Sequence, residues 1–217
     1  MNINELGKYL HGTHIAEIWQ SLLTLYDSVD HYTVAFQQRH AISCPVGCGT
    51  CCEHFIPEIT TEEASLVAAY ILLVKQDCSL LNRLESFDES SSVCPLYDKD
   101  SPFHCTVYPA RALICRLFGA CPSSDKQNRP IFRKCKYNTR NDTPEFVLPQ
   151  EFLIEEQPVS VMSVFGTQLK ALTADQILKP IHTSVLEAAG TLQFIMRYFT
   201  DNDSGPDIPN SPTPVAS

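Results

Sequence analysis

The sequence predicts an all-α domain in which helices enclose an irregular, cysteine-rich segment. Apolar residues recur at spacings of three and four near both ends of the chain, and no long stretch shows the alternation of a half-buried strand. All ten cysteines lie between positions 44 and 135. We therefore expect one helical domain over residues 1–200, organised around a cysteine cluster at 41–140, with a separate tail at 201–217.

The first expected element is a long amphipathic helix that begins after Thr13. Threonine is a favoured N-cap residue because its hydroxyl accepts a hydrogen bond from a free backbone amide of the first turn. The helix presents one apolar face, made of Ile15, Ile18, Trp19, Leu22, Leu25, Tyr26, Val29, Tyr32 and Phe36. The lone histidines on its polar side are expected to be solvated.

A short turn after this helix carries four thiols within nine residues, namely Cys44, Cys48, Cys51 and Cys52. Gly47 and Gly49 allow the backbone to fold tightly and to bring amide groups toward sulfur. Adjacent residues project in different directions, so Cys51 and Cys52 are not expected to bind one ion side by side. Either two metals lie close together, or one of these two thiols has another role.

The clustered cysteines leave three interpretations: disulfides, a metal or iron–sulfur site, or small apolar residues of a core. The first residues lack the basic and continuously apolar regions of a secretory signal, which favours a cytoplasmic protein with reduced thiols. Core thiols usually occur singly, which suits Cys78 better than the paired cysteines. Dense spacing in a reducing compartment therefore favours metal ligation.

Two further helices are expected between the cysteine turn and position 87. Thr60 and Glu63 form a capping-box pattern that begins the first of them. The apolar side of this helix comprises Leu66, Ala69, Tyr70 and Leu73, and that of the short helix after it comprises Leu80, Leu84 and Phe87. A polar loop at 88–92 then leads to Cys94.

A proline-punctuated loop carries Cys94 and Cys105, and a helix is expected to follow it from Pro109 to Phe118, with Gly119 just past its end. Spacings of three and four place Tyr108, Arg111 and Cys115 on one face of that helix. The segment 122–146, which contains Cys135, is expected to be a polar loop.

The C-terminal part regains helical character. A helix or two is expected between Gln150 and Leu172, and Ser184 and Glu187 form a second capping-box pattern before the last helix. The apolar positions of that helix are Leu186, Ala189, Leu192, Ile195 and Phe199. From Asp201 onward the composition is rich in proline and aspartate and is typical of a disordered tail.

The charge distribution indicates which partners the protein is expected to bind. The formal net charge of −9 argues against general nucleic-acid binding, and no apolar run is long enough to span a bilayer. Positive charge is nevertheless concentrated at 111–140, where Asp125 is the one acidic residue among Arg111, Arg116, Lys126, Arg129, Arg133, Lys134, Lys136 and Arg140. This stretch could offset the negative charge of metal-bound thiolates, which is a better use for it than phosphate binding.

Three blocks of the sequence resemble the YkgJ-like cysteine-cluster family, which is described as a zinc- or iron-chelating domain with a CxxCxxCC signature. The blocks are the Cys44–Cys52 turn, the Cys94-Pro-Leu segment, and the stretch Cys105-Thr-Val-Tyr108-Pro-Ala-Arg111-Ala-Leu-Ile-Cys115-Arg116-Leu-Phe118. Cys135 resembles the final cysteine of the family. Ala112 stands where the family usually has proline, and the first gap is one residue longer than in the signature, but neither change removes a thiol.

The resemblance implies eight metal ligands, namely Cys44, Cys48, Cys51, Cys52, Cys94, Cys105, Cys115 and Cys135. It also implies that Tyr108, Arg111 and Arg116 support these ligands. Cys78 and Cys121 are then extra, although Cys121 could exchange roles with Cys135, and His54 or His104 could replace a cysteine. Thiolates suit both zinc and iron–sulfur clusters, so the cofactor stays open between them.

The leading interpretation of function is therefore a metal-binding protein. An alternative is an enzyme that uses an iron–sulfur or iron centre to modify a protein side chain, because lysine N-methylases that act on flagellin have a similar cysteine pattern. Metal ions are the expected partners, and a protein substrate or partner stays open. The sequence identifies no catalytic residue, and the acidic net charge makes a nucleic-acid module the least favoured of the three interpretations.

Overall fold

The computed structural model describes residues 2–42, 44, 47–137, 143–149, 153–154 and 157–200. The tail at 201–217, for which the composition predicts disorder, lies outside the described residues. Within the described ranges most residues of regular structure are helical, and none of the helices there combines the length and the apolar character needed to cross a membrane.

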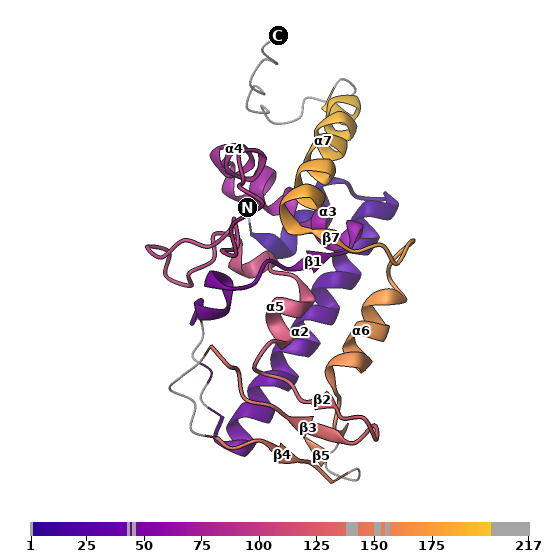
Figure 1. Ribbon diagram of the computed structural model, residues 1–217. Coiled ribbons are helices and arrows are strands. Elements are labelled where there is room, and N and C mark those ends of the chain that lie inside the picture. Colours follow the sequence, from indigo (N-terminus) through magenta and orange to yellow (C-terminus); the bar gives the residue numbers. More distant parts are fainter. Residues whose placement is uncertain are drawn as a thin grey trace.

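The longest helix, α2 (His14–His40), runs along the molecule as the predicted first helix (Figure 1). The Thr13 hydroxyl accepts a hydrogen bond from the Ala16 amide, which confirms the predicted cap. Two short N-terminal turns, η1 (Ile3–Glu5) and α1 (Leu6–Tyr9), precede α2. The helix ends at Ala41, which has a left-handed backbone with φ of 50°.

One end of the molecule is formed by helices that pack against α7 (Ile181–Thr200). These are α3 (Thr61–Ala69), which continues into the π-helical segment η3 (Tyr70–Lys75), and the short α4 (Ser79–Glu85). The capping box of Thr60 and Glu63 is confirmed at the start of α3. The capping box predicted at Ser184 is wrong, because Ser184 lies inside α7 and its hydroxyl donates to the Lys179 carbonyl at 3.3 Å.

Short strands correct the all-α prediction to a mostly helical fold with small sheets. The strand β1 (Glu58–Ile59) pairs antiparallel with β7 (Lys179–Pro180), next to the start of α7. A three-stranded antiparallel sheet comprises β2 (Ser123–Ser124), β3 (Pro130–Phe132) and β4 (Phe146–Val147). The first two strands lie within the segment 122–146 predicted to be a polar loop, and β4 lies at its end. Strands of two or three residues are too short to produce a recognisable alternation, so sequence periodicity does not reveal them.

The remaining elements lie beside α2. The hairpin of β5 (Leu153–Ile154) and β6 (Gln157–Pro158) precedes α6 (Met162–Lys170), which falls within the range predicted for a helix. The helix α6 runs alongside α2 and contacts it, while the three-stranded sheet covers the C-terminal end of α2 (Figure 1).

The helix predicted from Pro109 to Phe118 is interrupted. It consists of the 3-10 turn η4 (Tyr108–Ala110) and the separate helix α5 (Leu113–Leu117), and Arg111 between them is extended with ψ of 142°. The Arg116 side chain donates to the carbonyls of Pro109 at 2.7 Å and Arg111 at 3.0 Å. These side-chain bonds satisfy carbonyls at the break, which gives a physical reason for the interruption.

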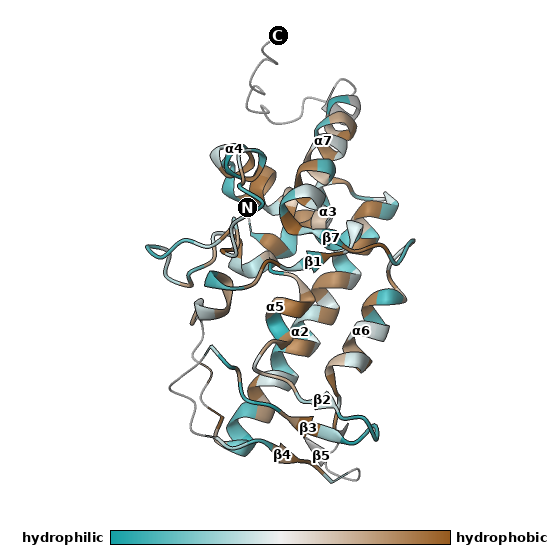
Figure 2. Ribbon diagram, in the orientation of Figure 1, coloured by the Kyte–Doolittle hydropathy of each residue, from teal (hydrophilic) through white to brown (hydrophobic). Residues whose placement is uncertain are grey.

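Two apolar clusters stabilise this arrangement. The larger one extends from Leu6 to Met196 and includes buried residues of α2, α3, α5 and α7, helices along which hydrophobic positions recur (Figure 2). The smaller one joins Phe36 and Ile42, at the end of α2, to Phe132 of β3 and to Leu148 after β4. It therefore fixes the chain on both sides of the cysteine segment.

Candidate metal centre

Seven of the eight cysteines predicted as ligands line one cavity of about 330 Å³. They come from the loops at 44–52 and 94–105 and from α5, and they are Cys44, Cys48, Cys51, Cys52, Cys94, Cys105 and Cys115. The three residues predicted to support the ligands, Tyr108, Arg111 and Arg116, line the same cavity. Thiols that lie up to 71 positions apart in the sequence are thus brought to one place.

The turn that carries Cys44 and Cys48 is shaped by two glycines. Gly47 and Gly49 have φ of 69° and 70°, a left-handed conformation that residues with side chains rarely adopt. A Cβ at Gly47 would lie 2.8 Å from the Phe103 Cα, and one at Gly49 would lie 2.3 Å from the His104 Cβ. The tight turn expected from the glycines is confirmed, and their missing side chains also allow the cysteine turn to contact the 94–105 loop.

Cys51 and Cys52 lie in the 3-10 turn η2 (Thr50–Glu53), and both line the cavity. Their sulfurs are 4.0 Å apart. Sulfurs around a tetrahedral zinc ion lie about 3.8 Å apart, given a Zn–S distance of about 2.3 Å. The tight turn therefore brings both thiols toward the same space, although they are adjacent in the sequence.

The loop that carries Cys94 and Cys105 is fastened to the cysteine turn through backbone bonds. The Cys94 amide donates to the Cys52 carbonyl at 2.7 Å. Within the loop, Cys105 forms an antiparallel bridge with Tyr97, and the Tyr97 hydroxyl donates to the Glu53 carboxylate at 2.5 Å. These contacts hold two pairs of thiols, one from each loop, at the lining of the same cavity.

Cys115 is positioned by the buried carboxylate of Glu63. One carboxylate oxygen of Glu63 accepts from the Leu113 amide, the first of α5, at 2.7 Å and from the Tyr26 hydroxyl at 3.0 Å. The other oxygen accepts from the Thr60 amide at 3.1 Å and completes the capping box. Glu63 therefore joins α2, α3 and α5, which fixes the helix that presents Cys115.

Cys135 does not line the cavity, but it lies beside Cys44. A Cβ on Gly119, whose φ is 71°, would meet the Cys135 Cβ at 3.0 Å, the Cys135 Sγ at 3.7 Å and the Cys44 Sγ at 4.0 Å. The small apolar cluster explains this neighbourhood, because Ile42 and Phe132 pack together two and three residues before the two cysteines.

Burial and mutual proximity raise the pKa of several thiols. Burial raises the pKa of Cys94 to about 12 and that of Cys115 well above its usual range. Burial, with the nearby Cys48, Cys135 and Cys51, raises the pKa of Cys44 to about 11. The hydrogen bond between the adjacent thiols raises the pKa of Cys52 and lowers that of Cys51. Without a cation, most of this cluster therefore favours the protonated form.

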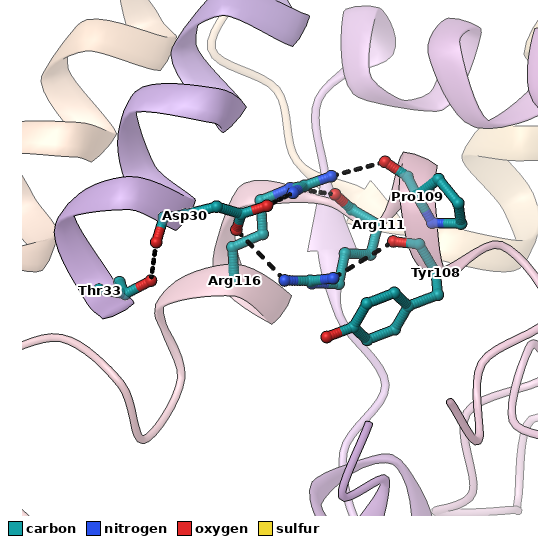
Figure 3. Close-up of polar contacts among 6 residues, drawn as sticks. All are labelled: Asp30, Thr33, Tyr108, Pro109, Arg111 and Arg116. Carbon is teal, nitrogen blue, oxygen red and sulfur yellow. Dashed lines mark hydrogen bonds and ion pairs between the residues drawn. The ribbon is translucent and has the colours of Figure 1, made fainter. Parts of the chain in front are cut away.

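Asp30 on α2 binds both arginines of the cavity wall (Figure 3). Its carboxylate pairs with Arg111 at 3.2 Å and with Arg116 through its second oxygen. Arg111 also stacks over the Tyr108 ring at 3.9 Å, and Arg116 stacks over the Tyr26 ring at 4.2 Å. The planar guanidinium groups are thus fixed in orientation by carboxylate, carbonyl and aromatic contacts.

Sequence reasoning missed Asp30 and the connecting role of Glu63. A signal for Asp30 exists, since positions 26, 29, 30 and 33 share the buried side of α2 and aspartate interrupts that apolar stripe. The capping box identified Glu63, but its contacts with Tyr26 and Leu113 join elements far apart in sequence. Only the fold reveals them.

The four residues considered as extra or replacement ligands are not part of this cavity lining. Cys121 is buried, and its thiol donates to the Ser160 carbonyl at 3.9 Å. Cys78 is half-buried immediately before α4. The His104 ring contacts the Gly47 carbonyl through Nδ1 at 2.5 Å, and the His54 ring stacks on Tyr137. His104 thus helps to hold the turn beside the thiols.

The donor set fits a thiolate-bound metal, although the thiols are not arranged around a single point. All ten cysteines are free, and in the described part of the chain no three histidine, cysteine or acidic side chains converge at the spacing of a metal site. A set of thiols beside fixed guanidinium groups nevertheless has the chemistry of zinc and iron–sulfur sites rather than of magnesium or calcium sites. Binding would require several sulfurs to turn toward a common ion.

One family comparison agrees with this chemistry. Residues 43–143 match the family described as "CxxCxxCC: Putative zinc- or iron-chelating domain". The match covers nearly the same segment as the resemblance inferred from the cysteine blocks, at 41–140, and confirms the resemblance. No curated protein and no solved structure shows a significant match to the chain.

Proposed function

We propose that this protein binds zinc or an iron–sulfur cluster through the thiolates of Cys44, Cys48, Cys51, Cys52, Cys94, Cys105, Cys115 and Cys135. The observation that carries the proposal is the convergence of seven of these thiols on one cavity of about 330 Å³, with the eighth beside Cys44. Buried structural cysteines have no need to gather in this way. The family match over residues 43–143 supports the same chemistry.

The thiols divide into two neighbourhoods that share Cys51. An outer group contains Cys44, Cys48 and Cys135, since the charge on Cys44 would interact with both of the others. An inner group contains Cys52, Cys94, Cys105 and Cys115. In this group Cys115 is within electrostatic range of Cys94 and Cys105, and Cys52 is within electrostatic range of Cys94. Cys51 is within electrostatic range of members of both groups. This division supports two zinc ions or a single cluster with thiolates on both sides.

The charges around the cavity support the thiolate form. Four thiolates around one zinc ion carry a net charge of −2, and a cysteine-bound iron–sulfur cluster is also anionic. Arg111 and Arg116 line the cavity, and Asp30 neutralises only one of these two cations. The metal would supply the positive charge that lets thiols with raised pKa values lose their protons on binding.

The proposal fits a reducing compartment such as the cytoplasm, in which ten thiols remain free. We further propose that residues 1–200 form one domain around this centre. The larger apolar cluster supports this organisation, because it joins the N-terminal helices to α7 across the cysteine segment.

Differential alkylation tests the assignment of ligands. We expect the eight proposed ligands to resist N-ethylmaleimide in the metal-loaded protein and to react after removal of the metal by a chelator. Cys78 serves as an internal control that reacts in both states because it is half-buried and lies outside the cavity. Equal labelling of the eight cysteines before and after chelation would contradict the proposal.

A further inference from the structure

A second and larger cavity, of about 680 Å³, lies on the other side of α5. Leu113, Ile114 and Leu117 of α5 line this cavity, whereas Ala112, Cys115 and Arg116 line the cavity that contains the thiols. Its volume is within the range of about 300–1,000 Å³ that is typical of small-molecule sites. It contains none of the ten cysteines and is therefore separate from the proposed metal centre.

The wall of this cavity is mainly apolar but contains one histidine with unused hydrogen-bonding capacity. His182, at the start of α7, has both ring nitrogens buried without a hydrogen-bond partner among the described residues. Its ring packs against Phe87 with centroids 4.8 Å apart. A buried polar group that makes no hydrogen bond costs about 1–3 kcal/mol, so a ligand that bonds to this ring would remove the penalty.

The charges of the lining favour a cation. Glu58, Glu63 and Glu89 are among the lining residues, and the lining contains no lysine or arginine from the described part of the chain. The Glu63 carboxylate already accepts from the Leu113 and Thr60 amides and from the Tyr26 hydroxyl, which leaves Glu58 and Glu89 for a cation. The Glu89 carboxylate lies 3.7 Å from the Nε2 atom of His182. Glu58 of β1 lies opposite Pro180 of β7 in the strand pair, and Pro180 is two residues before the histidine. Acidic groups thus adjoin the histidine from two chain segments.

The cavity is open at an apolar rim. Leu178 lines it and is 53% exposed, and the neighbouring Ile177 is 56% exposed. Exposed large aliphatic residues next to an apolar cavity are typical of the entrance to a ligand site.

We propose that this cavity binds a small aliphatic amine, with its hydrocarbon body against α5 and α6 and its protonated nitrogen beside His182 and Glu89. A ring nitrogen of His182 accepts one N–H of the ammonium group, and the Glu89 carboxylate accepts another in a charge-assisted hydrogen bond. An alkyl carboxylate would meet the like charge of Glu89, and an alcohol would lack the positive charge that pairs with this carboxylate.

Calorimetric titration of the full-length protein with octylamine, octanol and octanoate, below their aggregation concentrations, tests this proposal. We expect octylamine to bind at one site, about tenfold or more tighter than the other two compounds. Equal binding of the three compounds, or no binding of octylamine, would overturn the proposal.

Two glycines, one on α6 and one on α7, provide a matched pair of variants. A Cβ on Gly166, which lines the cavity from α6, meets no atom within 4 Å, and the same holds for Gly190, an exposed residue of α7 outside the lining. Gly166→Leu is expected to fill the cavity and abolish octylamine binding, whereas Gly190→Leu is expected to leave it unchanged. Equal binding by both folded variants would place the amine elsewhere and overturn the proposal.

The variant His182→Phe tests the polar contact separately from the shape of the cavity. It is expected to reduce octylamine affinity to within about threefold of octanol affinity, because the hydrocarbon contacts remain while the acceptor is lost. An unchanged preference for the amine would contradict the role of His182.

Discussion

Asp30 of α2 forms an ion pair with Arg116 of α5, a residue 86 positions later in the chain. The Arg116 side chain is only 4% exposed, so its charge depends on this carboxylate and on the carbonyls of Pro109 and Arg111. The same carboxylate binds Arg111. This contact ties the longest helix to the segment that presents Tyr108, Arg111 and Cys115 to the thiol cavity.

We predict that Asp30→Asn destabilises the protein by about 1–3 kcal/mol. Breaking a buried ion pair costs about 3–5 kcal/mol, and the partial exposure of Asp30 reduces that value. Urea unfolding measures the change, and Asp27→Asn is the control because Asp27 is exposed on the same helix. Equal stability of the two variants would show that the pair contributes nothing.

We predict that Arg111→Lys and Arg111→Ala both lose metal to a chelator faster than the wild type does. The Arg111 guanidinium contacts the Asp30 carboxylate and the Tyr108 carbonyl at once and stacks on the Tyr108 ring. A lysine keeps the charge but cannot reproduce the planar fork. The control is Lys126→Ala, at an exposed position of the same basic stretch. If both Arg111 variants retain metal as well as this control, the supporting role of Arg111 is wrong.

We predict that Glu63→Gln destabilises the protein by roughly 2–3 kcal/mol and also weakens metal retention. A hydrogen bond to a charged group contributes about 1.5–3 kcal/mol to stability. The side-chain amide of glutamine has an NH₂ group in place of one carboxylate oxygen, so this group would face a hydrogen-bond donor and lose the bond. Loss of the contact with the Leu113 amide would also loosen the start of α5. Unfolding and chelator competition are the measurements, with the exposed Glu85→Gln as control. A stability loss no larger than that of the control would refute the connecting role.

We predict that stability falls as the pH rises above about 9. Burial raises the pKa of the Cys121 thiol, so the native state holds its proton while the unfolded state releases it. The stabilising effect is fully present below the unfolded pKa and is lost as the pH rises toward the folded pKa. With an unfolded pKa of 9.0 for this thiol, the loss at pH 10 is about 1.4 kcal/mol.

Urea unfolding at pH 8 and pH 10 measures this loss for the wild type and for Cys121→Ala. Other groups also titrate in this range, so the comparison between the two proteins isolates the cysteine. The variant should show the smaller decrease, and an equal decrease in both proteins would contradict the assignment.

Local patterns were sufficient to predict most of the helices. The Thr13 cap and the Thr60–Glu63 capping box depend on residues within three positions of each other, and both are confirmed. The prediction fails where distant residues decide the structure. The helix from Pro109 is interrupted where Arg116 bonds to backbone carbonyls and to Asp30 of α2. The Ser184 capping box is displaced because α7 begins at Ile181, where the chain leaves the pairing of β7 with β1.

The candidate site was predictable as a set of residues but not as a geometry. Cysteine spacing and the blocks around Tyr108 and Arg111 identified the segment that the family match also covers. Spacing could not show that Cys51 and Cys52 face the same cavity, because this depends on the 3-10 turn after Gly49. Cysteine spacing also could not show that Cys135 lies beside Cys44, because packing of Ile42 against Phe132 brings those two segments together.

Metal bound by the clustered thiols can be detected chemically. The most direct measurement is metal and acid-labile sulfide analysis of protein purified without oxygen, for the wild type, Cys52→Ala and Cys78→Ala. We predict bound metal in the wild type and in Cys78→Ala and a reduced content in Cys52→Ala, with sulfide accompanying iron if the centre is a cluster and no sulfide if it is zinc. A wild-type protein that contains neither metal, or a Cys52→Ala variant that keeps the full content, would contradict the claim.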